Sequence, residues 1–80
     1  MDFIIGNYYL ITFNVIGKSL TFTCKIISEN NLFLKFIDKY GAKLNYNKNM
    51  IASFKEIKDK NMIASFEKEI KRREVNDIQI

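Results

Sequence analysis

The sequence predicts a mainly β domain that ends in a single α-helix. Polar and apolar residues alternate through residues 8–46, as is typical of strands that bury one face. Turn-forming groups interrupt this alternation at GKSL, SENN, DKYG and NKN. From about residue 58 onward, apolar residues recur three and four positions apart, which is helical spacing. We therefore expect five antiparallel strands within about residues 8–54 and a helix over about residues 58–74.

Length and composition indicate one small domain with a hydrophobic core. The chain has 80 residues, of which 48% are hydrophobic, and a chain of this size has little stability to spare. The single cysteine, Cys24, has no partner for an intrachain disulfide, which favours a reducing, cytoplasmic location. Asp2 stands where a signal peptide carries positive charge. No apolar run approaches the roughly 20 residues of a membrane-spanning helix, so we expect no membrane partner.

The alternation assigns the strand residues to two faces. The residues of the first three strands that are expected to face the core are Tyr9, Ile11, Phe13, Val15, Leu20, Phe22, Cys24, Ile26, Leu32, Leu34 and Phe36. In the fourth strand, Ala42, Leu44 and Tyr46 share one side. The residues expected to face solvent include Thr12, Asn14, Thr21, Thr23, Lys25, Phe33, Lys35, Lys43 and Asn45.

The hexamer NMIASF occurs twice, at residues 49–54 and 61–66, and a small tandem duplication explains it. The first copy follows a tight turn and continues the rhythm of the strands, so we expect a fifth strand there. The second copy lies in a segment whose apolar residues have helical spacing, namely Met62, Ile63, Phe66 and Ile70. Asp59 or Asn61 can cap this helix, and Glu67 can pair with Lys71 along it. We therefore expect one hexamer to adopt two structures.

Two alternatives concern the C-terminal half. Both copies of the hexamer could lie in one helix from about Lys48 to Glu74. Twelve residues at 100° each turn the second apolar stripe about 120° from the first, so such a helix would suit burial on two sides. Residues 75–80 are expected to form a tail or an edge strand, because Ile78 and Ile80 alternate with polar neighbours.

The stretch FIDKYGAKLNYNKNMIASFKEI, together with the strands before it, resembles the small β-barrels of the SH3-like and Sm-like superfold. In those barrels a charged turn with a glycine links the third and fourth strands, and a polar turn leads to a short last strand. The resemblance covers residues 8–57 and implies a five-stranded antiparallel barrel, here followed by a helix. The Arg-Gly signature of Sm-like RNA sites is missing, since Asn47, Lys48 and Asn49 stand there. The resemblance therefore implies neither a uridine pocket nor a ring assembly.

No motif in the sequence points to catalysis. Histidine is absent, which removes histidine-based acid–base chemistry and most zinc sites. Cys24 alternates with core residues and is expected to be an inert buried thiol. The acids of the first half, Asp2, Glu29 and Asp38, stand far apart in the sequence. We expect no enzyme activity, no metal, no cofactor and no small-molecule substrate.

The outward face of the strands predicts a nucleic-acid-binding surface. Lysines attract phosphates, and an exposed aromatic ring can stack on an unpaired base. The candidate residues are Lys25, Lys35, Lys43, Phe33, Tyr8, Lys18, Lys39 and Lys48. The same residue types also occur on any solvated strand face, and Tyr8 or Phe33 could pack under the helix instead.

The apolar stripe of the predicted helix indicates a second kind of site. If Met62, Ile63, Phe66 and Ile70 do not cover the barrel, they form a dimer or partner surface. The first hypothesis is therefore a small nucleic-acid-binding barrel that contacts the backbone with low sequence specificity. The second is a protein-interaction module, such as an inhibitor or regulator encoded by a phage or plasmid. Small size, a composition typical of an A/T-rich genome and a spare apolar face all fit this hypothesis, and such a genome could also be that of a low-GC bacterium or an archaeon. One contiguous basic face would favour the first hypothesis; scattered lysines beside an apolar groove or sheet edge would favour the second.

Overall fold

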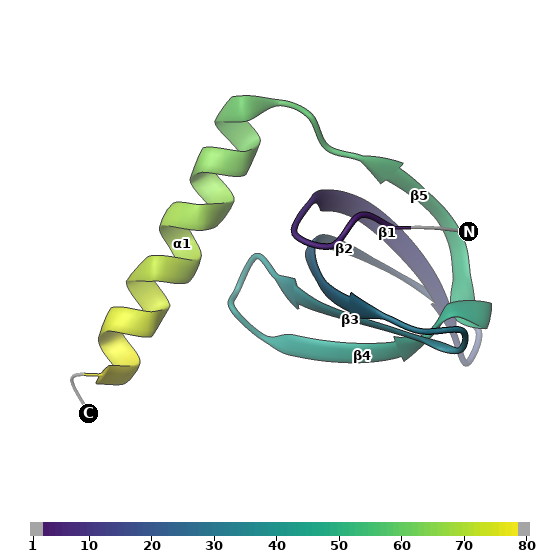
Figure 1. Ribbon diagram of the computed structural model, residues 1–80. Coiled ribbons are helices and arrows are strands. Elements are labelled where there is room, and N and C mark those ends of the chain that lie inside the picture. The colour runs from purple at the N-terminus through teal and green to yellow at the C-terminus, as the bar shows by residue number, and fades with distance from the viewer. Residues whose placement is uncertain (1–2, 79–80) are drawn as a thin grey trace.

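Five strands and one long helix make up the fold in the computed structural model, which describes the backbone of residues 3–78 and the side chains of residues 3–72 (Figure 1). The elements in chain order are β1 (Tyr8–Val15), β2 (Lys18–Glu29), β3 (Phe33–Asp38), β4 (Lys43–Asn47), the short 3-10 helix η1 (Lys48–Met50), β5 (Ile51–Glu56) and α1 (Lys60–Ile78). The expected mainly β class, with five strands and a C-terminal helix, is confirmed.

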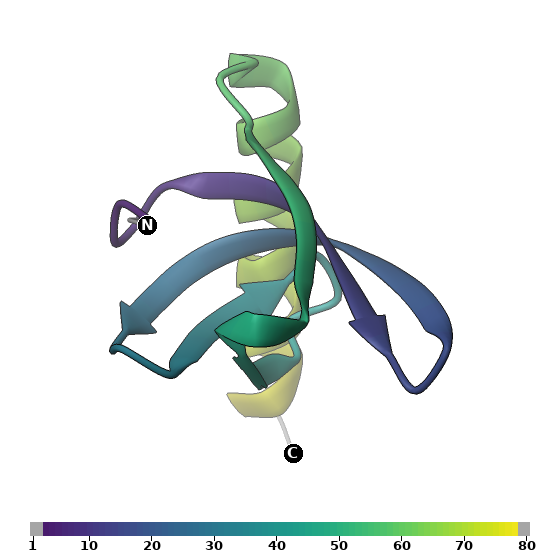
Figure 2. The ribbon, with the colours of Figure 1, turned by 90° about the vertical axis from the view of Figure 1, so that its right-hand side faces the viewer.

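The five strands form one antiparallel sheet in the order β4-β3-β2-β1-β5. β1 to β4 make a meander, and the chain then passes through η1 so that β5 pairs with the other side of β1. The sheet curls around its own core but does not close, because β4 and β5 remain its two edges (Figure 2). The register of β5 on β1 skips Ala52, which is a local bulge.

Local turn chemistry fixes the hairpins of the meander. Ile16 and Gly17 link β1 to β2 with φ angles of 48° and 75°, the positive values of a type I′ turn. In the next turn the Oδ1 of Asn30 accepts from the amides of Leu32 and Phe33, at 2.8 Å each. The β3–β4 turn is held by the Asp38 carboxylate, described below with the groove.

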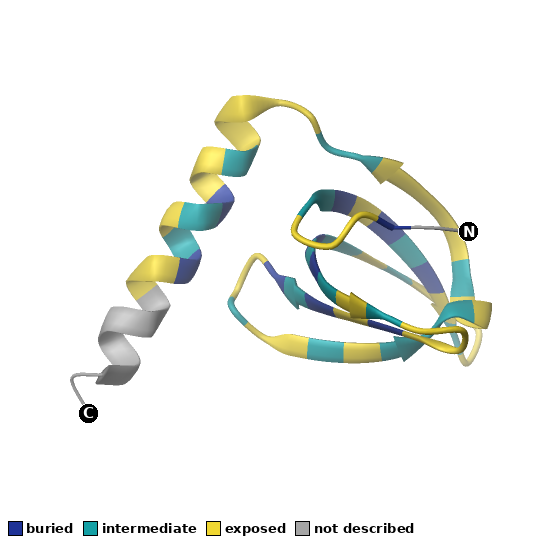
Figure 3. Cartoon of the chain, in the orientation of Figure 1, coloured by how far each residue is buried: buried dark blue, intermediate teal, exposed yellow. Residues whose placement is uncertain are grey.

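The buried residues of the strands lie on the inner face of the sheet, as the alternation predicts, and two further buried residues, Phe66 and Ile70, lie on α1 (Figure 3). The main core consists of Phe3, Tyr9, Ile11, Phe13, Cys24, Ile26, Leu34 and Phe36. The ring of Phe13 stacks on that of Phe36 at 5.6 Å. The prediction for Leu32 is wrong: this side chain is exposed because it lies in the turn, before the alternation of β3 begins.

The two copies of the hexamer adopt different structures. The first copy runs through η1 and β5, whereas the second lies inside α1, so the single-helix alternative is wrong. Asp59 caps α1, since its Oδ1 accepts from the amide of Asn61 at 2.8 Å. The helix continues through residues 75–78, past the expected end at Glu74, so these residues are neither tail nor edge strand. Ile80 lies outside the described residues.

Candidate functional site

One cross-strand row organises the outer face of the sheet. Tyr8 on β1 pairs with Lys25 on β2, Lys25 pairs with Ile37 on β3, and Ile37 pairs with Lys43 on β4. Directly paired residues of antiparallel strands project from the same face. Lys25 and Lys43 therefore flank the half-buried Ile37 on the face away from the core.

Two further candidates extend this row along β3. Lys35 lies two residues before Ile37 and faces the same way, opposite Asn45 of β4. Phe33 lies two residues earlier still and is 40% exposed. We define the β3–β4 face as the exposed residues Phe33, Lys35, Lys43 and Asn45. The structure thus brings the three candidate lysines of the strands together, with an aromatic ring at one end.

The helix α1 covers the other end of the row. The ring of Phe66 meets the ring of Tyr8 with 5.4 Å between centroids. The Nζ of Lys25 lies 3.0 Å from Oε2 of Glu67 and 5.7 Å from the centre of the Tyr8 ring. Tyr8 and Lys25 are therefore engaged within the chain. The sequence predicts a pair between Glu67 and Lys71. In the structure the partner of Glu67 is Lys25, which is distant in the sequence.

Lys48 has a structural role in addition to its charge. Its Nζ lies 2.6 Å from Oε2 of Glu29, and the two side chains are only 17% and 13% exposed. The same Nζ donates to the carbonyl of Asn30 at 2.9 Å, and Oε1 of Glu29 accepts from the amide of Phe3 at 3.1 Å. These contacts tie η1 to the end of β2 and to the N-terminal segment. Sequence reasoning missed Glu29, because Lys48 lies far from it in the chain.

The two remaining candidate lysines do not join the β3–β4 face. Lys18 pairs with the inward residue Val15 and lies an even number of positions from the buried Cys24, so its side of the sheet is opposite to that of Lys25. Lys39 lies in the β3–β4 turn, with its Nζ 5.2 Å above the ring of Tyr40.

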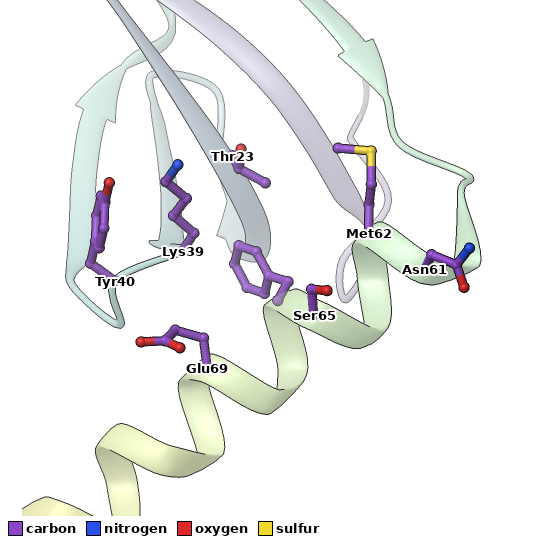
Figure 4. Close-up of a pocket in the computed structure, with 8 residues that line it drawn as sticks. Thr23, Lys39, Tyr40, Asn61, Met62, Ser65 and Glu69 are labelled. Atoms are coloured by element: carbon purple, nitrogen blue, oxygen red, sulfur yellow. The ribbon is translucent and has the colours of Figure 1, made fainter.

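A groove separates α1 from the sheet beside this turn (Figure 4). Its volume is about 560 Å³, and its lining residues are Thr23, Lys39, Tyr40, Asn61, Met62, Ser65, Phe66 and Glu69. The turn that forms one wall is held by the buried Asp38, whose Oδ1 accepts from the amides of Tyr40 and Ala42 at 2.9 Å each.

The candidate partner-binding residues of the helix have unequal exposure. Phe66 and Ile70 are buried, and Ile63 is half-buried. Met62 is 50% exposed. Most of the apolar stripe is therefore used within the chain, and Met62 is the member that remains at the surface.

Cys24 has the environment of a core thiol. Its side chain is fully buried, and its Sγ lies 3.5 Å from the carbonyl oxygen of Phe22. Burial, and secondly the negative charge of Asp38, raise the pKa of the Cys24 thiol far above its usual range. Thiolate chemistry is thereby suppressed at neutral pH. Among the residues that the structure describes, no cluster of His, Cys, Asp or Glu could hold a metal ion.

Comparison of the chain with known proteins adds no assignment: no family model, no curated protein and no solved structure matches it. Within the described residues, no helix is both long and apolar enough to cross a membrane.

Proposed function

We propose that the protein binds single-stranded nucleic acid through the β3–β4 face. The observation that carries this proposal is the register, which places Lys35 and Lys43 on one exposed face, with Lys25 in the same row and Phe33 beside them. Two ammonium groups on adjacent strands, with no ion-pair partner among the described residues, attract successive phosphates. The exposed ring of Phe33 provides a surface on which an unpaired base stacks.

The polar neighbours of these residues suit backbone contacts. Asn45 lies opposite Lys35, and Asn47 lies opposite Phe33. The side-chain amides of asparagine donate hydrogen bonds to phosphate and sugar oxygens. Such contacts carry no direct information about the base sequence. We therefore expect low sequence specificity and a strong dependence on salt.

The fold fits this role. The strand order, with a 3-10 turn between β4 and β5, supports our proposal that the sheet is an open relative of the SH3-like and Sm-like barrels. The buried, unpaired Cys24 supports a cytoplasmic location.

Fluorescence anisotropy with mixed-sequence oligonucleotides, single- and double-stranded, DNA and RNA, tests the proposal. We expect single strands to bind more tightly than duplexes, and log Kd to vary linearly with log salt. Each lost phosphate contact lowers the salt slope by about 0.7, so Lys35→Ala with Lys43→Ala should lower it by about 1.4.

Lys18→Ala with Lys58→Ala is the matched control. This pair removes the same charge from exposed positions outside the β3–β4 face, so it should leave most of the affinity and slope unchanged. Phe33→Ala should weaken single-strand binding without altering the slope. Equal losses in the two lysine pairs would mean that net charge alone is responsible, and the proposed face would be rejected.

A second candidate function is protein interaction at the free edge of β5. Ala52, Ser53, Phe54 and Lys55 are all exposed, and β5 pairs on one side only. Such an edge can accept an extended strand from a partner protein. The partner is either a second copy of this chain or, if this protein is an inhibitor encoded by a mobile element, the protein that it inhibits. Sedimentation equilibrium tests self-pairing, and a monomer at every concentration argues against it.

A further inference from the structure

The edge of β1 is built to hold a sequence that the chain contains twice. Residues 48–54 and 60–66 both read KNMIASF, a heptamer that includes the lysine before each hexamer. The first copy occupies the edge of β1 as η1 and the start of β5. The second copy forms the first turns of α1.

Most of the contacts that attach the first copy to the sheet are made by residues of the heptamer itself. Ile51 pairs with Phe13, Ser53 with Thr12 and Phe54 with Ile11. The ring of Phe54 also lies 4.8 Å from that of Phe3.

The first two residues of the heptamer make further contacts. Its lysine, Lys48, pairs with Glu29 at 2.6 Å. The amide of its Asn49 donates to Oδ1 of Asn47 at 2.8 Å. Within the heptamer the second copy carries the same residue types, with Lys60 in place of Lys48 and Phe66 in place of Phe54, and the acceptor before it is Asp59 in place of Asn47.

We propose that the edge of β1 is a binding site for the KNMIASF segment, with two alternative ligands in the same chain. In the alternative state, Lys60–Phe66 forms η1 and β5 in place of Lys48–Phe54, a displacement of twelve residues. Residues 48–59 then become a loop between β4 and the new strand. The entropic cost of closing such a loop rises only slowly with its length.

The residues after the heptamer explain why the first copy is favoured. Oε2 of Glu56 accepts from Nδ2 of Asn7 at 3.2 Å, and the half-buried Ile57 donates its amide to the carbonyl of Tyr8 at 2.8 Å. In the displaced register Lys68 and Glu69 take these two positions. Lysine cannot accept from Asn7, and Glu69 would replace an apolar side chain.

Of the large apolar side chains in the two copies, only that of Phe66 is buried. In β5 the run from Ala52 to Lys55 is exposed, so strand pairing carries most of its attachment. Among the described side chains of α1, two large ones are buried, Phe66 and Ile70. Exchange of the two copies would remove Phe66 from Tyr8 and Glu67 from Lys25. Tyr8 and Lys25 would then become accessible on the outer face of the sheet.

Selective ¹³C labelling of alanine provides a direct readout, because the chain has alanine at 42, 52 and 64 only. Cα and Cβ shifts distinguish helix from strand, and Ala64 lies in α1 while Ala52 lies in β5. The amide of Ile57 points to β1, and amides alternate along a strand, so that of Ser53 also points to β1. Ser53→Pro therefore removes a bond to β1 and blocks the first copy.

In the Ser53→Pro chain we expect a folded sheet in which the Ala64 signals move from helical to strand positions. Ser65→Pro is the matched control, since it blocks the second copy, and it should leave Ala52 in a strand. The double variant should lose the sheet. Retention of helical Ala64 shifts in Ser53→Pro, or unfolding of that variant alone, would contradict the proposal.

Deletion of residues 48–59 tests the same site without a proline. Lys60 then follows Asn47 directly, and the chain keeps one copy of the heptamer. We expect this shorter chain to fold with Ala64 in β5 and with Lys60 paired to Glu29. A chain that fails to fold, or that keeps Ala64 helical, would show that the second copy cannot occupy the edge of β1.

Discussion

The ring of Phe66 stands edge-on to the ring of Tyr8, with 5.4 Å between centroids and 74° between planes. This contact joins the middle of α1 to the outer face of the sheet, on the side opposite to the main core. Edge-to-face pairs of this kind are favourable beyond the area that they bury. The fold thus uses both faces of one small sheet.

Removal of the Phe66 ring should detach α1. Phe66 is 4% exposed, and we expect Phe66→Ala to lower the free energy of unfolding by up to about 3 kcal/mol. Urea unfolding followed by circular dichroism at 222 nm measures the change. Met62→Ala on the same helix, where the side chain is half exposed, should change it by less than about 0.5 kcal/mol. Equal effects of the two substitutions would rule out Phe66 as the anchor.

The ion pair between Lys48 and Glu29 should contribute more stability than any exposed lysine. Lys48→Met leaves the largely buried Glu29 carboxylate without its 2.6 Å partner, at a cost of about 2 kcal/mol. Lys43→Met removes an exposed charge and should change stability by less than about 0.5 kcal/mol. Thermal or urea unfolding of both variants provides the comparison. A small loss for Lys48→Met would show that water replaces the pair at little cost.

The β1–β2 turn contains a residue that its backbone disfavours. Ile16 has a φ of 48° and is 96% exposed, and a β-branched residue is strained in this region. Asparagine tolerates it, so Ile16→Asn should stabilise the protein by about 1 kcal/mol. Ile16→Val keeps the branched side chain and should bring no gain. A loss of stability in Ile16→Asn would indicate that the Ile16 side chain has a partner.

Stability should decline in mild alkali because of Cys24. Burial holds the pKa of this thiol far above its usual range in the folded state, whereas the unfolded thiol ionises near pH 8.5. The unfolded state therefore releases a proton above that pH, and the free energy of unfolding falls by about 1.4 kcal/mol per pH unit.

Urea unfolding between pH 8 and 9.5 measures this slope. Cys24→Ala should be less stable throughout, since it leaves a cavity, but it should lack the component of the slope that comes from the thiol. Identical slopes in the two proteins would mean that other groups dominate the alkaline behaviour.

The sequence was sufficient to predict the strand faces and the two roles of the hexamer. Period-2 alternation is a local property, and residues such as Ile11 and Phe36 are buried where it places them. The second copy is helical because Asp59 caps it and because apolar residues continue at helical spacing to Ile70.

The features that the sequence did not predict depend largely on contacts between distant segments. Sequence patterns do not show which outward residues a helix will cover, so Tyr8 and Lys25 could not be distinguished from Lys35 and Lys43. The partnership of Lys48 with Glu29 likewise joins η1 to the end of β2, which are far apart in the sequence. The helix extends beyond its expected end because the sequence after Glu74 contains neither glycine nor proline to stop it.

The position of β5 in the sheet has a consequence for the order of folding. β1 to β4 are joined by tight turns, whereas β5 pairs with β1 across the whole meander. Local hairpins form within microseconds, and pairing across a long loop is slower. We therefore expect the edge of β1 to be filled last, after the meander has formed. Ala52→Gly should then speed unfolding while leaving the refolding rate almost unchanged, and stopped-flow kinetics can measure both.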